Sequence, residues 1–208
     1  MQFNYDPVDA DEANRQRAIY EPFTQAVREL LDATIRTQAG PDDIAEATRL
    51  IQSVTAGLRT SQIDGPFGIR FTTEGEGMSW GNPVIGVRNP MAPPLEIKRG
   101  EGRCWTDFEL GAAYEGPPNH VHGGISALIL DHILGEAASD GGNRPLFTGT
   151  ITLKYLRGTP LGALRSEAWV ERVEGVKTYA RGFISDADGP TVEADGVFIT
   201  PAWARDPQ

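Results

Sequence analysis

Residues 122–135 of the chain read HGGISALILDHILG, and they are its most informative segment. The segment is rich in alanine, leucine and isoleucine and holds no proline, so we expect a helix from Gly124 to about Ala138. Apolar residues cover nearly every side of this helix, which is typical of a helix buried in a protein core. No apolar run reaches the roughly 18 residues of a membrane span. The sequence therefore predicts a core helix.

Asp131 is the polar residue of most interest on this helix. A carboxylate that loses hydration in apolar surroundings is a plausible proton acceptor near neutral pH. At the start of the helix, the N–H groups of Gly123 and Gly124 have no helical partner and lie at the positive end of the helix dipole, where an oxyanion is stabilised. Asp131 follows Gly124 by about two turns, roughly 10 Å along the axis, and lies on the same side. One helix therefore offers an oxyanion site and an ionisable acid.

All three histidines of the chain, His120, His122 and His132, lie in or beside this motif. A His-x-His pair with Asp131 or His132 could bind a metal ion, but the chain lacks the cysteines of a structural zinc site, and such pairs are common in turns without metal. We therefore expect no metal. His122 is expected to orient the turn or position a substrate. His120 is expected to be a solvated loop residue, and His132 a hydrogen-bonded residue at a packed interface.

Composition narrows the class of partner and the compartment. The chain has 208 residues, 39% of them hydrophobic, and a formal net charge of −10. That charge argues against nucleic acid or an anionic membrane as the main partner. A single cysteine excludes an intrachain disulfide. The first residues lack the basic and apolar regions of a signal peptide, so we expect a cytoplasmic protein.

Two helices are predicted in an N-terminal extension over residues 1–62. Residues 9–38 read as helical, with a break expected at Pro22 because proline suits the first turn of a helix and not its interior. A second amphipathic helix is expected over residues 41–59, with apolar residues at helical spacing. We expect this pair to pack on the main domain or on a partner subunit, and a substrate lid is the alternative.

Residues 63–208 alternate strand-like runs with glycine and proline, which predicts a second, sheet-containing domain. Strands are expected near residues 67–73, 83–88, 103–113, 146–157, 164–174, 177–186 and 191–200. The last four are long and joined by short turns, which indicates an antiparallel meander. A sheet curled around the buried helix would cover it on most sides, so we expect an α+β domain.

The central motif resembles the hotdog-fold acyl-CoA thioesterases of the 4-hydroxybenzoyl-CoA thioesterase superfamily. In the phenylacetate-degradation type, a His-Gly-Gly opens the central helix and an Asp follows nine residues after the His, as His122, Gly123, Gly124 and Asp131 do here. Residues 89–95, 114–118, 148–157 and 173–178 also resemble segments of these proteins. The resemblance covers roughly residues 78–200 and implies a hotdog fold, in which a curved antiparallel sheet wraps a long central helix.

The resemblance also implies an activity, the hydrolysis of an acyl-CoA to the free acid and CoA. No cofactor is implied beyond the CoA of the substrate. The Gly123 N–H, helped by Gly124, would bind the thioester oxygen. Asp131 would act as a general base on water or as a nucleophile, and the sequence leaves both routes open. Thr148 matches a Ser or Thr that helps to hold the water in relatives.

Substrate binding is expected from three further residues. Arg157 and Lys177 stand at strand ends where relatives place basic groups against the phosphates of CoA, and a guanidinium suits phosphate well. Many relatives carry Asn or Gln six residues before the His, where this chain has Gly116, and Asn119 stands nearer the motif. The resemblance further implies a homodimer, or a dimer of dimers, with the pocket between subunits.

Two other functions stay open at this point. The chain could be a non-catalytic acyl-CoA-binding hotdog protein, which the glycine at position 116 favours. It could also be a hotdog hydratase or dehydratase, although the sequence settings in which those enzymes pair a His with an acid are not evident here.

Overall fold

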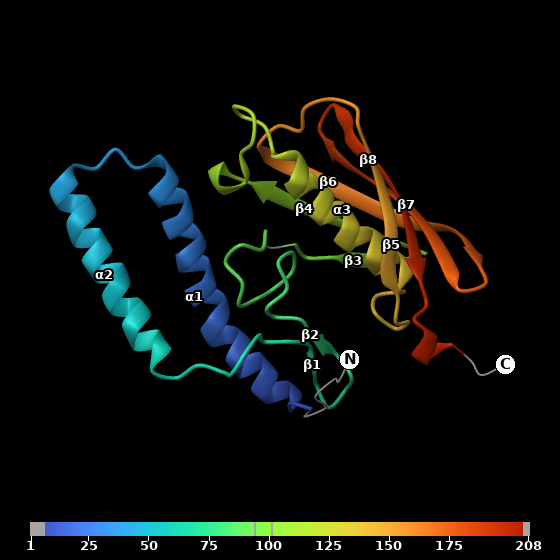
Figure 1. Cartoon of the computed structure of the whole chain (residues 1–208), viewed down its shortest axis with the longest axis horizontal. Helices are drawn as coiled ribbons and strands as arrows, with labels where there is room; N and C mark the ends of the chain where they lie inside the picture. Colours follow the sequence, from blue (N-terminus) through green and yellow to red (C-terminus); the bar gives the residue numbers. More distant parts are fainter. Residues whose placement is uncertain (1–6, 94, 101, 206–208) are drawn as a thin grey trace.

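The computed structural model of the chain describes residues 7–93, 95–100 and 102–205. It is an α+β structure in which one helix lies against a six-stranded antiparallel sheet, with two further helices on the other side of the molecule (Figure 1). The helices are α1 (Ala10–Arg36), α2 (Pro41–Arg59) and α3 (Gly123–Ala138), with short 3-10 helices η1 (Ala112–Tyr114) and η2 (Ala202–Ala204). The strands are β1 (Arg70–Phe71), β2 (Gly77–Met78), β3 (Lys98–Gly100), β4 (Arg103–Leu110), β5 (Phe147–Tyr155), β6 (Gly162–Glu174), β7 (Lys177–Asp186) and β8 (Gly189–Ile199).

The central helix α3 is a core helix, as its composition predicts. Ile129, Leu130, Ile133 and Leu134 are all fully buried against the inner face of the sheet. The sheet curves around α3, with the helix packed across β4, β6, β7, β8 and β5 (Figure 1). Among the described residues, no helix has the length and apolar character needed to cross a membrane.

The strand order of the main sheet is β3-β4-β6-β7-β8-β5, and every neighbouring pair is antiparallel. The expected four-strand meander is therefore wrong in one respect: β5 pairs with β8 and not with β6. The connection over residues 156–161 crosses three strand spacings, about 14 Å. Six extended residues reach about 20 Å. A connection of this length therefore permits β5 to lie beside β6 or three strands away, beside β8. As a result β5 forms an edge of the sheet.

Two of the expected strands are corrected by the structure. Residues 83–88 form turns, because the Asn82 side chain accepts hydrogen bonds from the N–H groups of Val84 (2.7 Å) and Ile85 (3.2 Å). Such side-chain bonds compete with strand pairing. The strand expected at 67–73 is only the two-residue β1, and the short β3 was not expected.

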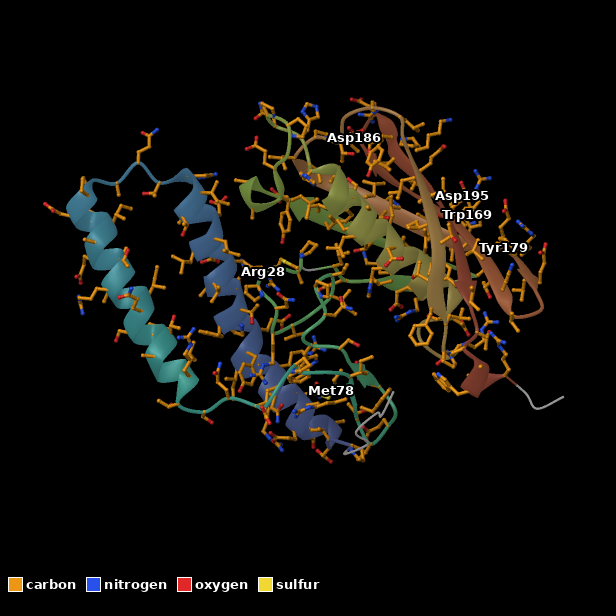
Figure 2. All side chains as sticks on the ribbon, viewed as in Figure 1. Arg28, Met78, Trp169, Tyr179, Asp186 and Asp195 are labelled. Atoms are coloured by element: carbon orange, nitrogen blue, oxygen red, sulfur yellow. The ribbon has the colours of Figure 1, made fainter. Side chains whose placement is uncertain are left out.

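The expected break at Pro22 does not occur, since α1 is continuous from Ala10 to Arg36. A proline inside a helix loses a hydrogen bond and costs about 3 kcal/mol. Packing on both sides of Pro22 offsets this cost: Ala13 and Thr24 are buried, and Arg28 donates from Nε to the Ala92 carbonyl at 3.1 Å. Figure 2 shows Arg28 directed from α1 toward the segment that precedes β3. The N-terminal helix α1 thus packs on the main domain, while the boundary near residue 62 stays a prediction.

Candidate active site

The start of α3 presents one open amide. His122 is the N-cap, and its Nδ1 accepts a hydrogen bond from the Gly124 N–H at 3.0 Å. The Gly123 N–H has no hydrogen-bond partner in the part of the chain that the structure describes. The expected help from Gly124 is therefore not available while this cap is formed, because its amide is already engaged. Gly123 is the donor that a ligand can reach at the positive end of the helix dipole.

His122 acts on the turn through its cap. Because Nδ1 accepts a hydrogen bond, the ring carries its proton on Nε2 in this arrangement. The position six residues earlier, Gly116, lies directly against this residue: a Cβ there would stand 2.7 Å from the His122 Cα. An Asn or Gln at position 116 would not fit without a backbone shift.

Tyr155 on β5 is a site residue that the sequence reading did not single out. Its hydroxyl donates a hydrogen bond to the Gly123 carbonyl at 2.9 Å. A Cβ on Gly123 would stand 3.4 Å from the Tyr155 ring and hydroxyl. The ring thus packs beside the open amide and fixes the peptide that follows it. Only the pairing of β5 with the rest of the sheet brings residues 123 and 155 together, so no local pattern could have revealed this contact.

A cavity of ≈ 410 Å³ opens beside this turn. Its lining includes Pro117, His120, Val121, Gly123, Ser126, Tyr155, Arg157, Gly158 and Thr159. The cavity therefore brings together the open amide and one of the expected phosphate-binding residues. Asn119 is not among the lining residues. Its backbone is in the left-handed region (φ 60°), and its N–H donates to Glu115 Oε1 at 2.7 Å, which indicates a turn residue.

The two expected phosphate-binding residues differ in their surroundings. The Arg157 guanidinium donates from Nη1 to Asp186 Oδ2 at 2.7 Å and from Nη2 to the Gly189 carbonyl at 2.8 Å. Hydrogen bonding of Arg157 to the Asp186 carboxylate lowers the pKa of Asp186 to about 2. Lys177 begins β7 whereas Asp186 ends it, which separates Lys177 from the Arg157 pair by about 30 Å. Within one chain, the two cations do not meet the same phosphate group.

Asp131 and Thr148 form the second half of the expected site. The Thr148 hydroxyl on β5 donates to Asp131 Oδ1 on α3 at 2.9 Å. Asp131 is half-buried and Thr148 is exposed. The acid is thus neither in open solvent nor sealed inside the core. It lies where the helix faces the edge strand β5.

The open amide and the acid are far apart within one chain. Asp131 follows Gly123 by eight residues, which is about 12 Å along the axis of α3. An oxyanion donor must lie about 3 Å from the carbonyl oxygen, and a general base must reach the attacking water at similar range. One carbonyl group therefore cannot use both residues of a single chain.

The remaining histidines have surroundings that differ from those expected. His120 is half-buried at the cavity, with Nδ1 2.8 Å from the Pro118 carbonyl, and is not a solvated loop residue. Burial lowers the pKa of His132, and its Nε2 has no hydrogen-bond partner among the described residues. The nearest acid, Glu136, is 3.8 Å from that nitrogen. Within residues 7–93, 95–100 and 102–205, no three His, Cys, Asp or Glu side chains are grouped so as to hold a metal ion.

Comparison with known proteins identifies the family. The model of the thioesterase superfamily matches residues 118–193, which include the turn, α3 and β5. A solved structure described as a thioesterase superfamily protein is 33% identical, covers 86% of this chain and 94% of its own, and superposes with a TM-score of 0.78. Since residues 63–208 are about 70% of the chain, that match also includes part of the N-terminal extension.

Two curated relatives carry an enzyme name. Acyl-coenzyme A thioesterase THEM5 of Mus musculus is 33% identical over 95 residues, which cover 44% of this chain and 38% of that protein. Acyl-coenzyme A thioesterase THEM4 of Xenopus laevis is 32% identical over 106 residues, which cover 49% of this chain and 46% of that protein. The chain spans less than half the length of both relatives. The match to the solved structure, by contrast, runs over nearly all of that protein, and the chain belongs to the thioesterase superfamily, with its hotdog fold.

Proposed function

We propose that the protein hydrolyses an acyl-CoA thioester to the free acid and CoA, at a site shared between two copies of the chain. The observation that carries this proposal is the separation of Gly123 from Asp131 along α3. Each chain has an oxyanion donor at one place and an acid with a hydroxyl partner at another. The names of the two curated relatives support the thioester as the bond that is cleaved.

The edge strand β5 supports the second copy. It has a neighbour on one side only in the described sheet, and seven of its nine residues are exposed. Exposed strand edges carry unpaired N–H and C=O groups and readily pair with another chain. Thr148 and Tyr155 stand near opposite ends of this strand. Antiparallel pairing of two β5 strands would bring Thr148 and Asp131 of one copy toward the Gly123 turn of the other.

In the proposed reaction the thioester oxygen accepts a hydrogen bond from the Gly123 N–H. Asp131 of the other copy takes a proton from a water molecule held with Thr148, and the water oxygen bonds to the carbonyl carbon. The C–S bond then breaks, and the CoA thiolate receives the proton. In the alternative route, the Asp131 carboxylate bonds to the carbonyl carbon and the C–S bond breaks to release the CoA thiolate. Water then hydrolyses the resulting anhydride to the free acid, and its proton passes to the thiolate. Either route consumes only water besides the substrate.

A binding protein without catalysis is the second candidate function. Gly116 favours it, because the amide side chain of many relatives is missing here and His122 occupies the space. Binding without turnover would still use the Gly123 amide and the cavity beside Arg157. The two candidates differ in whether free thiol is produced.

Thiol release from short, long and aromatic acyl-CoAs, followed with a thiol reagent, tests the proposal. We expect turnover with at least one of these substrates, and a fall of about 10²–10⁴-fold in Asp131→Asn, the range typical for loss of a general base. Far-UV circular dichroism of the variant should match that of the wild type, because the substitution keeps the size of the side chain. Turnover of Asp131→Asn near the wild-type level would remove Asp131 from the mechanism. Binding of acyl-CoA without thiol release from any substrate would favour the binding protein.

A further inference from the structure

Helix α2 keeps an apolar side that nothing in the described chain covers. None of its residues is buried. Ile44, Leu50, Ile51, Val54 and Leu58 are each 42–58% exposed, and they recur at the spacing of one helix face. An isolated amphipathic helix of this length gains most of its stability by packing its apolar face. The helix therefore lacks the contact that its sequence pattern requires.

Helix α1 adds a second apolar stripe. Its side that carries Ala13 and Thr24 packs on the main domain. Ile19, Phe23 and Leu30 lie on a different side and are 41–68% exposed. Leu31 and Ile35, nearer the end of the helix, are also exposed. Figure 1 shows α2 beyond α1, on the side away from the sheet.

The polar side of α2 is suited to solvent. Arg49 and Glu46 form an ion pair there, with side chains 65% and 56% exposed. Acidic residues lie in the first turn, where the helix dipole favours them. The contrast between the two sides identifies the apolar stripe as a contact surface.

The exposed apolar area matches what an interface between two copies needs. The ten large apolar side chains of α1 and α2 are 38–68% exposed. A large apolar side chain has roughly 60–120 Å² of apolar surface, so ten such side chains that are about half exposed offer roughly 300–600 Å². A standard interface takes about 800 Å² from each partner, a little more than half of it apolar. This area is comparable to the largest apolar patch of a typical monomer, and such patches are often contact sites.

We propose that the α1–α2 hairpin packs on the hairpin of a second copy of this chain, around a two-fold axis, as a four-helix bundle. A two-fold contact requires one surface that is complementary to itself. Each hairpin supplies two apolar helices joined by the short connection over residues 37–40, which is the unit of such bundles. Apart from Asp43 in the first turn, the stripe of α2 holds no charged residue, so two copies of this acidic chain can meet along most of it without like charges in contact.

This contact is separate from the proposed pairing of β5 strands. The helix α2 and strand β5 lie on opposite sides of the molecule (Figure 1). The hairpin contact therefore does not depend on the proposed hydrolase activity, and each can be tested without the other.

Cysteine crosslinking tests the hairpin contact with a matched control. Ala47 lies within the apolar stripe, and Ala56 lies nine residues later, on the opposite side of the same helix. The natural Cys104 does not interfere, because it is buried and burial raises the pKa of its thiol to about 12. With a flexible bismaleimide at micromolar protein, Ala47→Cys should give a covalent dimer and Ala56→Cys should not. Equal crosslinking of the two variants, or none with Ala47→Cys, would overturn the proposal.

Native mass gives a second and independent readout. The double variant Ile51→Asp, Val54→Asp places two charges in the stripe of each copy. We expect its native mass to be half that of the wild type, with thiol release unchanged because both residues are far from Gly123 and Asp131. An unchanged native mass would refute the hairpin contact. If the wild-type protein itself releases no thiol from any acyl-CoA, only the proposed hydrolase activity is refuted and the hairpin contact is not.

Discussion

At the scale of single residues, the candidate site depends on one N–H group that is kept open. His122 satisfies the amide of Gly124, Tyr155 holds the carbonyl of Gly123, and the Gly123 N–H is left for a ligand. The motif predicted a donor at this turn. Which of the two glycines supplies it depends on the direction of the His122 ring and on a tyrosine 32 residues away, which no spacing within the motif encodes.

Replacement of Gly123 by proline should remove this donor and little else. Proline is favoured at the first position of a helix, and His122 before it already has the extended conformation (ψ 132°) that a proline requires. We expect thiol release to fall by about 10²–10³-fold, the usual effect of losing one oxyanion donor. Gly123→Ala keeps the N–H and has room for its Cβ, so it should stay close to wild type. Equal activities of Gly123→Pro and Gly123→Ala would exclude the amide as the donor.

The half-buried His132 should make the fold sensitive to mild acid. Burial lowers the pKa of this histidine, although Glu136 and Asp131 nearby act in the opposite direction and Arg99 adds to the lowering. The unfolded chain then binds a proton below about pH 6.5 that the folded chain does not. Stability from the neutral ring is therefore present above pH 6.5 and is lost as the pH falls toward the lowered pKa.

The measurement is urea unfolding at pH 7.5 and pH 5, for the wild type and His132→Gln. We expect the wild type to lose more of its free energy of unfolding between these two pH values than the variant, because glutamine does not titrate. The same loss in both proteins would show that another group causes it.

At the scale of elements, the sequence predicted correctly those helices and strands whose formation depends on interactions between residues close in the chain. The sequence located α3 to within one residue, because apolar residues on every side and an N-terminal glycine pair leave few alternatives. It did not place β5 beside β8, since strand order depends on which edge of the sheet is open and not on the strand itself. The turn around Asn82 resembles a strand in composition, but side-chain hydrogen bonds to the backbone override that preference.

The unbroken helix α1 provides a test at this scale. Pro22→Ala restores a backbone hydrogen bond inside the helix and should raise the free energy of unfolding by roughly 1–3 kcal/mol. Pro41→Ala is the control, because Pro41 stands in the first turn of α2 where proline is favourable. We expect no gain from the control in urea unfolding. A stability of Pro22→Ala at or below that of the wild type would show that the helix needs proline at this position.

At the scale of the whole molecule, the two proposed contact surfaces lie where a single chain leaves a strand edge or a helix face uncovered. One edge carries the exposed strand β5, whose Thr148 contacts Asp131 of α3, and the opposite side carries the uncovered stripe of α2. The sequence could name the acid, the hydroxyl and the amide, because each belongs to a recognisable motif. The spacing along the helix already places the amide and the acid roughly 10 Å apart. The sequence could not show that Thr148 and Tyr155 contact these two residues, because both contacts depend on where β5 pairs in the sheet. Under the proposed function, the separation calls for a site built by two chains.

Complementation between two inactive variants tests this central claim most directly. Asp131→Asn removes the acid and Gly123→Pro removes the oxyanion donor, so neither variant alone should release thiol at an appreciable rate. The two variants are co-expressed with different tags, and the heterodimer is purified on both tags. If each site is shared between two chains, one of the two sites in the heterodimer combines an unchanged Asp131 with an unchanged Gly123 and stays intact. The account predicts about half of the wild-type activity per dimer. A heterodimer no more active than either parent variant would contradict the shared site. It would mean that Asp131 and Gly123 of the same chain act together.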